Sequence, residues 1–181
     1  GDDGRVRFYL DRIDVSDPAR PRRLTAINIP GSPVWYDPGA ARLVTVDYQR
    51  EERAATGWDD CYGVAGWGYD SWYDYETGVC ARLTRSLNLL EVDGDRAVLL
   101  DRLEFTEQRL RDVRVTGERV FVGTEVRDWY YWYGDTIDGT DPRPELLTFT
   151  GLQGGALELR DEVRMSTPGT WLHAARGTTA Y

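Results

Sequence analysis

FYLDRIDVSDPARPRRLTAINIPGSPVWYDPGAARLVTVD, residues 8–47, decides the fold, because apolar and polar side chains alternate through it in short runs. A period of two is typical of β-strands, and the pieces PG (30–31) and DPGA (37–40) between the runs are typical of turns. The pattern returns twice. Its first run (8–17) recurs at 85–94 and 145–154, its second (22–31) at 97–106 and 156–165, and its final pair (32–47) at 109–124 and 170–181.

The size of this repeat predicts a β-propeller. Without two insertions of about 32 and 17 residues, each copy holds four strands in about 44 residues, which is the size of one propeller blade. We therefore predict an all-β chain, one β-propeller segment over residues 1–181 with about three blade equivalents of four antiparallel strands. Its ends are offset by half a blade: the chain starts at the third strand of one blade and ends at the second strand of another. The nearest candidate for a helix is DYQREERAAT (47–56).

One stretch also carries a family resemblance. LDRIDVSDPARPRRLTAINIPG (10–31) resembles the LVIVD-type repeat of secreted bacterial β-propellers, in which a strand ending in D-V-S-D-P-x-x-P leads to another strand and a short turn. The other copies keep the strand rhythm but read EVDGDRAVLL (91–100) and GLQGGALELR (151–160) at that position. The resemblance implies a propeller fold and secretion, and it supplies no catalytic residues. Independently of it, Pro18 and Pro21 restrict the connection and Asp17 is placed to cap its turn.

Bulk composition excludes two classes of protein. A net charge of −9 argues against nucleic-acid binding, and no apolar run reaches the roughly 18 residues of a transmembrane helix. The chain opens on GDDGRVRFYL, which we interpret as a mature or excised piece of a longer precursor. Three blades do not close a ring, so either the chain is a fragment of a longer protein or two copies complete six blades. Open strand edges at both ends favour self-association.

Two insertions interrupt the repeat, and both carry unusual side chains. GWDDCYGVAGWGYDSWYDYETGVC (57–80) lies in the insertion 51–81, and DWYYWYGDTIDGTD (128–141) lies in the insertion 127–144. Each follows the second strand of a blade and precedes the third, so we expect both on the same propeller face. Cys61 and Cys80 are expected to form a disulfide that closes a loop of about 20 residues and contributes roughly 3 kcal/mol. A disulfide favours a secreted, periplasmic or cell-surface protein.

The insertions hold 12 of the 22 aromatic residues and five of the seven tryptophans. Trp and Tyr offer a large contact area at low entropic cost, and aromatics beside carboxylates suit sugars or a basic protein partner. The predicted binding residues are Trp58, Trp67, Trp72, Tyr73, Tyr75, Trp129, Tyr130, Trp132 and Tyr133. The alternative is that these rings pack on one another and only stiffen the long loops.

Calcium is the cofactor to consider, since it binds carboxylate and carbonyl oxygens. Neither insertion fits the D-x-[DN]-x-[DN]-G pattern. In the first insertion the clustered acids are Asp70, Asp74 and Glu76. The second insertion has the better spacing, and it provides the candidate ligands Asp135, Asp138 and Asp141. The alternative is a solvated acidic loop.

Catalysis has little support in the sequence. The single histidine, His173, lies in a predicted inner strand, and neither G-x-S-x-G nor H-E-x-x-H occurs. The sequence therefore favours a non-catalytic extracellular module that binds a protein or a glycan through an aromatic, acidic propeller face. Two alternatives stay open: a hydrolase with its site at the mouth of the propeller channel, and a purely structural propeller of the cell envelope.

Overall fold

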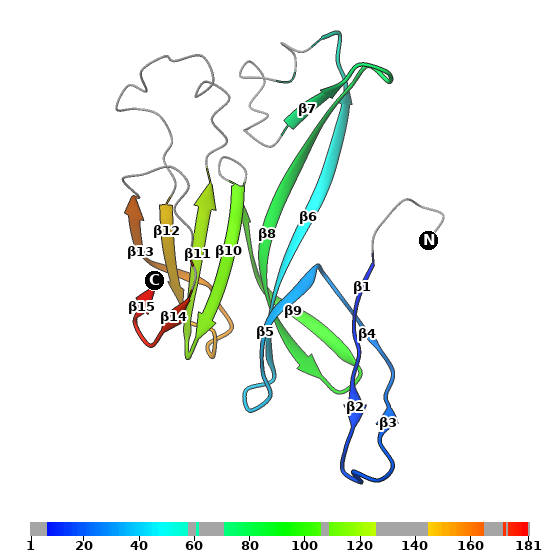
Figure 1. Ribbon diagram of the computed structural model, residues 1–181, viewed down its shortest axis with the longest axis vertical. Coiled ribbons are helices and arrows are strands. Elements are labelled where there is room, and N and C mark those ends of the chain that lie inside the picture. Colours follow the sequence, from blue (N-terminus) through cyan, green and yellow to red (C-terminus); the bar gives the residue numbers. More distant parts are fainter. Residues whose placement is uncertain are drawn as a thin grey trace.

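A computed structural model shows an all-β chain, as the alternation predicted (Figure 1). The structure describes residues 7–57, 61, 71–105, 109–125, 145–164, 172 and 174–180, with the backbone alone at 71, 72, 82, 109 and 125. Over this part of the chain all elements are strands and no helix occurs. The described strands are β1 (Phe8–Leu10), β2 (Ile13–Asp14), β3 (Arg22–Arg23), β4 (Ile27–Ile29), β5 (Ser32–Asp37), β6 (Arg42–Ala54), β7 (Ser71–Asp74), β8 (Val79–Asp93), β9 (Arg96–Phe105), β10 (Arg109–Thr116), β11 (Arg119–Glu125), β12 (Glu145–Thr150), β13 (Glu158–Arg164), β14 (Ala175–Arg176) and β15 (Thr179–Ala180).

The first sheet is an antiparallel meander of β5, β6, β8 and β9, with β7 added to it. β6 pairs with β8 over its whole length, from Arg42 opposite Glu91 to Ala54 opposite Val79. β9 and β7 share the other edge of β8: β9 pairs with its second half and β7 with its first. The segment 47–56, the nearest candidate for a helix, is therefore mostly strand, because residues 47–54 pair with β8.

The second sheet repeats the same order without an added strand. β10, β11, β12 and β13 follow one another as antiparallel neighbours. The tight turn between β10 and β11 is centred on Gly117, whose φ of 58° lies in the left-handed region. The sequence predicted a pair of strands over residues 109–124, and β10 and β11 confirm it with their turn between Thr116 and Arg119.

A two-stranded hairpin lies at each end of the chain. At the amino-terminal end β1 pairs with β4 and β2 with β3, and at the carboxy-terminal end β14 pairs with β15. The carboxylate of Asp17 accepts the backbone N–H of Ala19 at 3.1 Å, so Asp17 caps the β2–β3 turn as predicted. Arg12 ties the amino-terminal hairpin to the first sheet by donating to the carbonyl of Gly94, in the β8–β9 turn.

Two apolar cores cover the two faces of the first sheet. The larger core lies between the first and second sheets and contains Val44, Leu87 and Leu89 from the first and Val120, Val122, Leu147 and Phe149 from the second. The smaller core joins the other face to the amino-terminal hairpin and contains Ile27, Ile29, Leu43 and Leu90. Adjacent residues such as Leu43 and Val44 enter different cores, because successive side chains of a strand point to opposite faces.

Polar side chains also connect the layers. Arg85 of β8 donates from Nη1 to the carbonyl oxygen of Leu110 in β10 at 2.7 Å. Asp101 of β9 accepts the backbone N–H of Leu157, just before β13, at 2.7 Å. Both bonds join the first sheet to the second. A hydrogen bond from or to a charged group contributes about 1.5–3 kcal/mol, so these contacts add to the apolar core in holding the sheets together.

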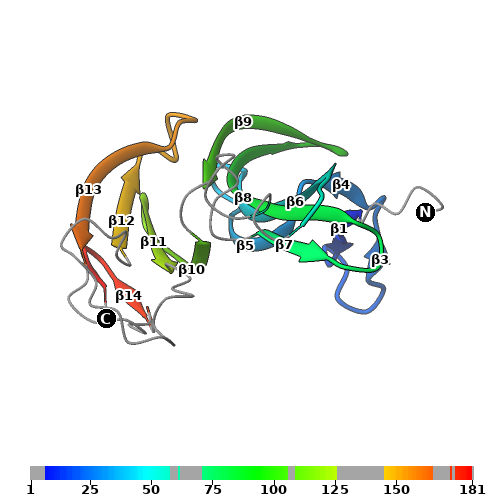
Figure 2. The same cartoon turned by 90° about the horizontal axis from the view of Figure 1, so that it is seen from above.

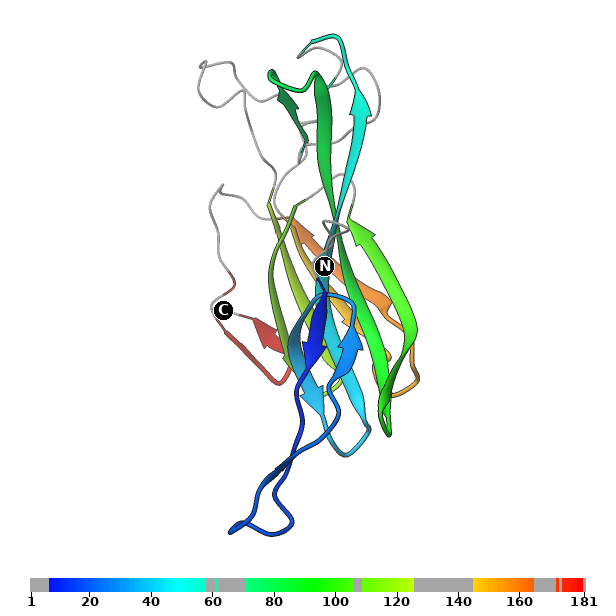
Figure 3. The same cartoon turned by 90° about the vertical axis from the view of Figure 1, so that its right-hand side faces the viewer.

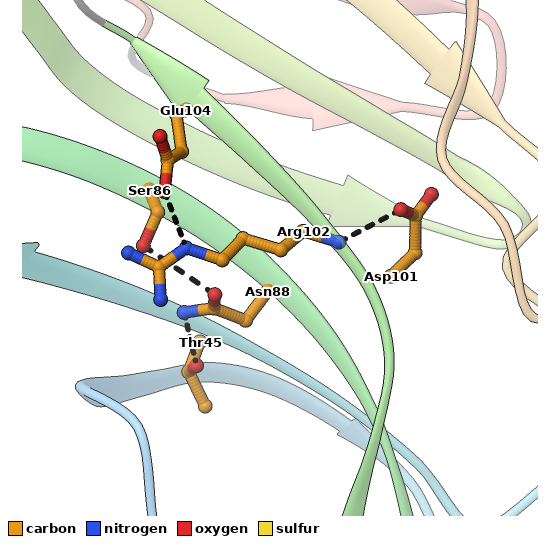
Figure 4. A network of polar contacts seen from close by, with 6 residues as sticks. All are labelled: Thr45, Ser86, Asn88, Asp101, Arg102 and Glu104. Carbon is orange, nitrogen blue, oxygen red and sulfur yellow. Dashed lines mark hydrogen bonds and ion pairs between the residues drawn. The ribbon is translucent and has the colours of Figure 1, made fainter.

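A buried polar row crosses the first sheet beside the smaller core (Figure 4). Asn88 donates to Thr45 Oγ1 at 3.2 Å and accepts from Ser86 at 3.4 Å, and Thr45 in turn donates to the carbonyl of Pro30. Arg102, opposite Asn88 in β9, forms an ion pair with Glu104 at 3.1 Å. The row holds the β4–β5 connection against β6, because Thr45 lies in β6 and Pro30 is the first residue of this connection.

Candidate functional site

The first insertion is built on a long β-ribbon rather than on a loop alone. We define the insertion ribbon as residues 49–57 and 71–84, in which β6 and β8 continue past the sheet and β7 pairs with β8 as a third strand. The ribbon stands clear of both sheets at one end of the molecule (Figures 1 and 3). Within the insertion, Ser71–Asp74 pairs with Val79–Arg82 as a strand beyond the four of the repeat.

The predicted disulfide is present and anchors this ribbon. Cys61 and Cys80 are bonded, with 5.5 Å between their Cα atoms, and both side chains are buried. Cys80 lies in the middle strand of the ribbon, opposite Arg53 of β6 and Tyr73 of β7. The bond therefore ties residue 61 to β8, the strand with which both β6 and β7 pair in the ribbon.

The turn between β7 and β8 is closed by Asp74. Its Oδ1 accepts the backbone N–H groups of Glu76 at 2.9 Å and of Thr77 at 3.3 Å, and Gly78 continues the turn with a φ of 65°. The bond from Glu76 is the main reason that the pKa of the Asp74 carboxyl lies below its ordinary value of 3.8. The Thr77 side chain and N–H lower it further, and the positive charge of Arg50 adds to the effect.

Two of the predicted binding tyrosines meet at this turn. Tyr73 and Tyr75 pack edge to face, with ring centroids 4.9 Å apart and an angle of 81° between the rings. Tyr73 is half-buried, whereas Tyr75 is 75% exposed. The pair thus combines a supported ring with an open one, which is an arrangement that can accept another ring, a sugar face or a cation.

The ribbon also carries basic residues, which the stretch 57–80 does not contain. Arg50 pairs with Glu52 at 2.6 Å, and Arg53 lies opposite Cys80 in the ladder. Tyr48 is exposed at the base of the ribbon. These residues join the candidate site because β6 continues to residue 54. The sequence analysis did not predict this continuous strand pairing beyond residue 47.

The second insertion joins the second sheet at the same end of the molecule as the ribbon, where β11 ends and β12 begins (Figure 1). Thr124 fastens this junction: its Oγ1 accepts the N–H of Glu145 at 2.9 Å and donates to the carbonyl of the same residue at 3.2 Å. The end of β11 and the start of β12 are therefore held together where the second insertion leaves the sheet.

Several predicted site residues are not tested by the structure. For Trp72 the structure gives only the backbone, which lies in β7. The other predicted residues outside the described part are Trp58, Trp67, Trp129, Tyr130, Trp132 and Tyr133, the calcium candidates Asp70, Asp135, Asp138 and Asp141, and His173.

Within the described residues no three His, Cys, Asp or Glu side chains come together as a metal site. The carboxylate of Asp74 already closes the turn, which is a structural use of one acid of the first insertion. The described part also contains no helix with the length and apolarity needed to cross a membrane.

The described site is thus a disulfide-anchored ribbon whose tip presents a tyrosine pair beside charges of both signs. Comparison of the chain with protein-family models, with curated proteins and with solved structures gives no match in any of the three.

Proposed function

We propose that the chain is a β-propeller segment of a secreted or cell-surface protein, and that it acts as a non-catalytic interaction module. The insertion-bearing end binds a protein or a glycan. The observation that carries this proposal is the ribbon itself: a disulfide and a third strand stabilise an element that leaves the core and presents Tyr75 to solvent. Binding residues are often carried by segments that project from a rigid scaffold, which positions them for contact.

The strand arrangement supports the propeller part of the proposal. Each complete sheet is a four-stranded antiparallel meander, which is the make-up of a propeller blade. The first strands of successive units lie beside one another, β5 next to β10 and β10 next to β14. The fourth strands of the first two units, β4 and β9, are also in contact. The two sheets and the amino-terminal hairpin are therefore stacked in a row (Figure 2), and the first strands β5 and β10 of the two sheets face each other.

The disulfide supports the proposed location. Disulfides persist in oxidising compartments and are uncommon in the cytosol of most organisms. Cys61 and Cys80 lie in the insertion rather than in the core of a sheet, so the bond stabilises the element that we assign to binding. The resemblance of residues 10–31 to the LVIVD-type repeat remains a hypothesis that agrees with this location.

The chemistry of the ribbon sets the class of ligand. Tyr75 offers an open ring face for stacking, and Tyr73 holds this ring in place from one side. Arg50, Glu52 and Glu76 add donors and acceptors for hydroxyl groups or for charged side chains. This combination suits neutral or weakly charged sugars and basic protein surfaces better than nucleic acid, which the net charge of −9 disfavours.

The test is binding of the oxidised chain to a glycan array and to a panel of purified basic proteins. For any ligand found, we expect the double variant Tyr73→Ala, Tyr75→Ala to bind at least about 10-fold more weakly, as for a central aromatic contact. The double variant Tyr73→Phe, Tyr75→Phe should keep most of the affinity, because the ring faces remain. Leu99→Ala, which removes an exposed apolar side chain of β9, is the matched control and should bind like the unchanged chain.

If the double variant Tyr73→Ala, Tyr75→Ala bound the ligand as tightly as the control Leu99→Ala does, the tyrosine pair would not belong to the site. Absence of binding to every glycan and every protein of the panel would contradict the proposed function as stated.

A further inference from the structure

The turn between β7 and β8, at the tip of the insertion ribbon, presents hydrogen-bond acceptors, because its backbone donors are already used (Figure 1). The N–H groups of Glu76 and Thr77 donate to the Asp74 carboxylate at 2.9 and 3.3 Å. The N–H of Gly78 donates to the carbonyl of Asp74 at 2.9 Å. Successive backbone N–H groups are what a turn offers to an anion, and here all three are engaged inside the turn.

The side chains of the same turn are negative. Residues 74–78 contain two carboxylates and no basic residue, and the wider stretch 57–80 contains five carboxylates and no basic residue. Glu76 is exposed, and within the described part of the chain its carboxylate has no ion-pair partner. Arg50, whose positive charge acts on this turn, is already paired with Glu52 at 2.6 Å. The tip of the ribbon therefore attracts positive charge and repels negative charge.

The tyrosine pair beside this turn offers ring faces to a cation. The ring centroids of Tyr73 and Tyr75 are 4.9 Å apart, and the rings are inclined by 81°. In such an edge-to-face pair, the ring that contributes its edge keeps both of its faces clear of the other ring. A positive group beside that ring can lie within about 6 Å of both centroids, which is the range of cation–π attraction. Tyr75 is 75% exposed, so the pair can be reached from solvent.

The ribbon fixes the backbone that carries the ring and the acid. Asp74 closes the turn around Tyr75, and the carbonyl of Gly78 accepts the N–H of Ala55, just after β6, at 3.0 Å. Two residues beyond this glycine, Cys80 is held by the disulfide. Backbone that is ordered before binding loses less conformational entropy in a complex, so the tip is prepared for a contact.

We propose that the tip of the insertion ribbon binds a basic side chain of a partner protein, with arginine as the preferred residue. This inference rests on the binding role proposed above for the ribbon, and it chooses a protein over a glycan. The planar guanidinium stacks on the face of Tyr75 and donates to the Glu76 carboxylate, whereas a lysine ammonium acts as a compact point charge. A neutral sugar gains less from the charge of Glu76, and the three backbone donors of the turn are closed to its hydroxyl groups.

The test uses a short peptide with blocked ends in which glycine and arginine alternate. Its matched control is the same peptide with citrulline in place of arginine, because citrulline keeps the shape of the side chain and removes its charge. A third peptide carries lysine at these positions. Each peptide is titrated into the oxidised full chain, and the backbone amide signals are followed by NMR.

We expect the arginine peptide to shift the amide signals of residues 74–78, the lysine peptide to bind more weakly, and the citrulline peptide to leave these signals in place. Tyr75→Leu should weaken binding of the arginine peptide about 2- to 5-fold, as for one exposed cation–π contact. Glu76→Gln should weaken it about 2-fold, as for an exposed ion pair. Glu118→Gln is the matched control, because it removes the same charge from an exposed position in the β10–β11 turn, and it should bind like the unchanged chain.

Equal binding of the arginine and citrulline peptides would overturn the inference, because the site would then not recognise a cation. Equal effects of Glu76→Gln and Glu118→Gln would also overturn it, since the peptide would then respond to the net charge of the chain alone. A glycan that depends on the tyrosine pair, together with an arginine peptide that leaves residues 74–78 unshifted, would overturn this inference and support the binding role of the ribbon. Failure of every glycan, protein and peptide to bind would contradict both.

Discussion

The disulfide offers the sharpest test of how the insertion ribbon is held. Cys61 and Cys80 lie 19 positions apart in the sequence. In the chain-entropy model, a cross-link across a loop of this length lowers the entropy of the open chain and so stabilises the closed form by about 3 kcal/mol at room temperature. The perturbation is the double variant Cys61→Ala, Cys80→Ala. A loss of about 3 kcal/mol corresponds to roughly a 100-fold larger population of the opened ribbon, since each 1.4 kcal/mol is a factor of ten.

The loss should be local, because the ribbon extends beyond both apolar cores. Residues 49–54 pair with residues 79–84, and β7 pairs with residues 79–82, whereas the buried leucines and valines of the large core begin further along these strands, with Val44 and Leu87. Local opening does not require the core to open. We therefore expect the two sheets to keep their stability while the ribbon loses much of its own.

Hydrogen exchange measured by mass spectrometry separates the two cases. Backbone amides of residues 49–54 and 79–84 should exchange roughly 100-fold faster in the variant, whereas amides of β11 should be unchanged. The unchanged chain treated with a reductant is the control, since it lacks the cross-link but keeps both sulfur atoms. Unaltered exchange in the ribbon, or equal acceleration in β11, would show that the disulfide does not anchor a separate element.

Three further predictions concern the sheets and the turn. Arg85→Ala should lower the free energy of unfolding, measured in urea, by about 1.5–3 kcal/mol, because it leaves a carbonyl of β10 without its charged donor. The control Arg96→Ala removes an exposed ion pair and should lower it by less than about 1 kcal/mol. Similar losses for both variants would contradict the assigned bond. Gly31→Ala should cost at least about 3 kcal/mol, since its φ is 73° and a Cβ would lie 2.1 Å from a backbone oxygen of β6. Gly94→Ala, with a φ of 59° and open space, should cost only about 1–2 kcal/mol, and the reverse order in a thermal melt would refute this reasoning. Because its folded pKa is lowered, Asp74 contributes stability that is present above its ordinary value of 3.8 and lost as the pH falls through the folded value. Asp74→Asn should therefore remove part of the acid dependence of ribbon exchange, and an unchanged pH profile would show that the turn does not depend on this carboxylate.

Local patterns explain why the strands were predictable from the chain. Alternation of polar and apolar residues is a property of neighbouring positions, and it is retained in β8, β9, β11 and β12. The tight turns around Gly117 and Gly177 follow from the same local chemistry, since both glycines have positive φ. The disulfide was also predictable, because the chain has only two cysteines.

The candidate site was predictable in its location but not in its construction. The aromatic composition of residues 57–80 predicts a binding site, and among its predicted residues the structure describes Tyr73 as half-buried and Tyr75 as exposed. The third strand β7 and the ladder from Gln49 to Ala54 were missed, because charged residues such as those at 50–53 weaken an alternating pattern. Strand pairing with β8 stabilises these positions all the same, and pairing partners are distant in sequence.

The amino-acid sequence by itself determined that this chain is all-β and that its two cysteines pair, because strand period and turn chemistry depend on nearby residues and two cysteines allow one pairing. Only the tertiary structure decided that β6 and β8 continue into a ribbon, that Asp74 closes its turn, and that Tyr73 supports Tyr75. It also decided which apolar side chains stay uncovered at the two ends of the chain. These features depend on which backbone and side-chain groups meet across a sheet or between sheets, and such contacts join residues that no local pattern relates.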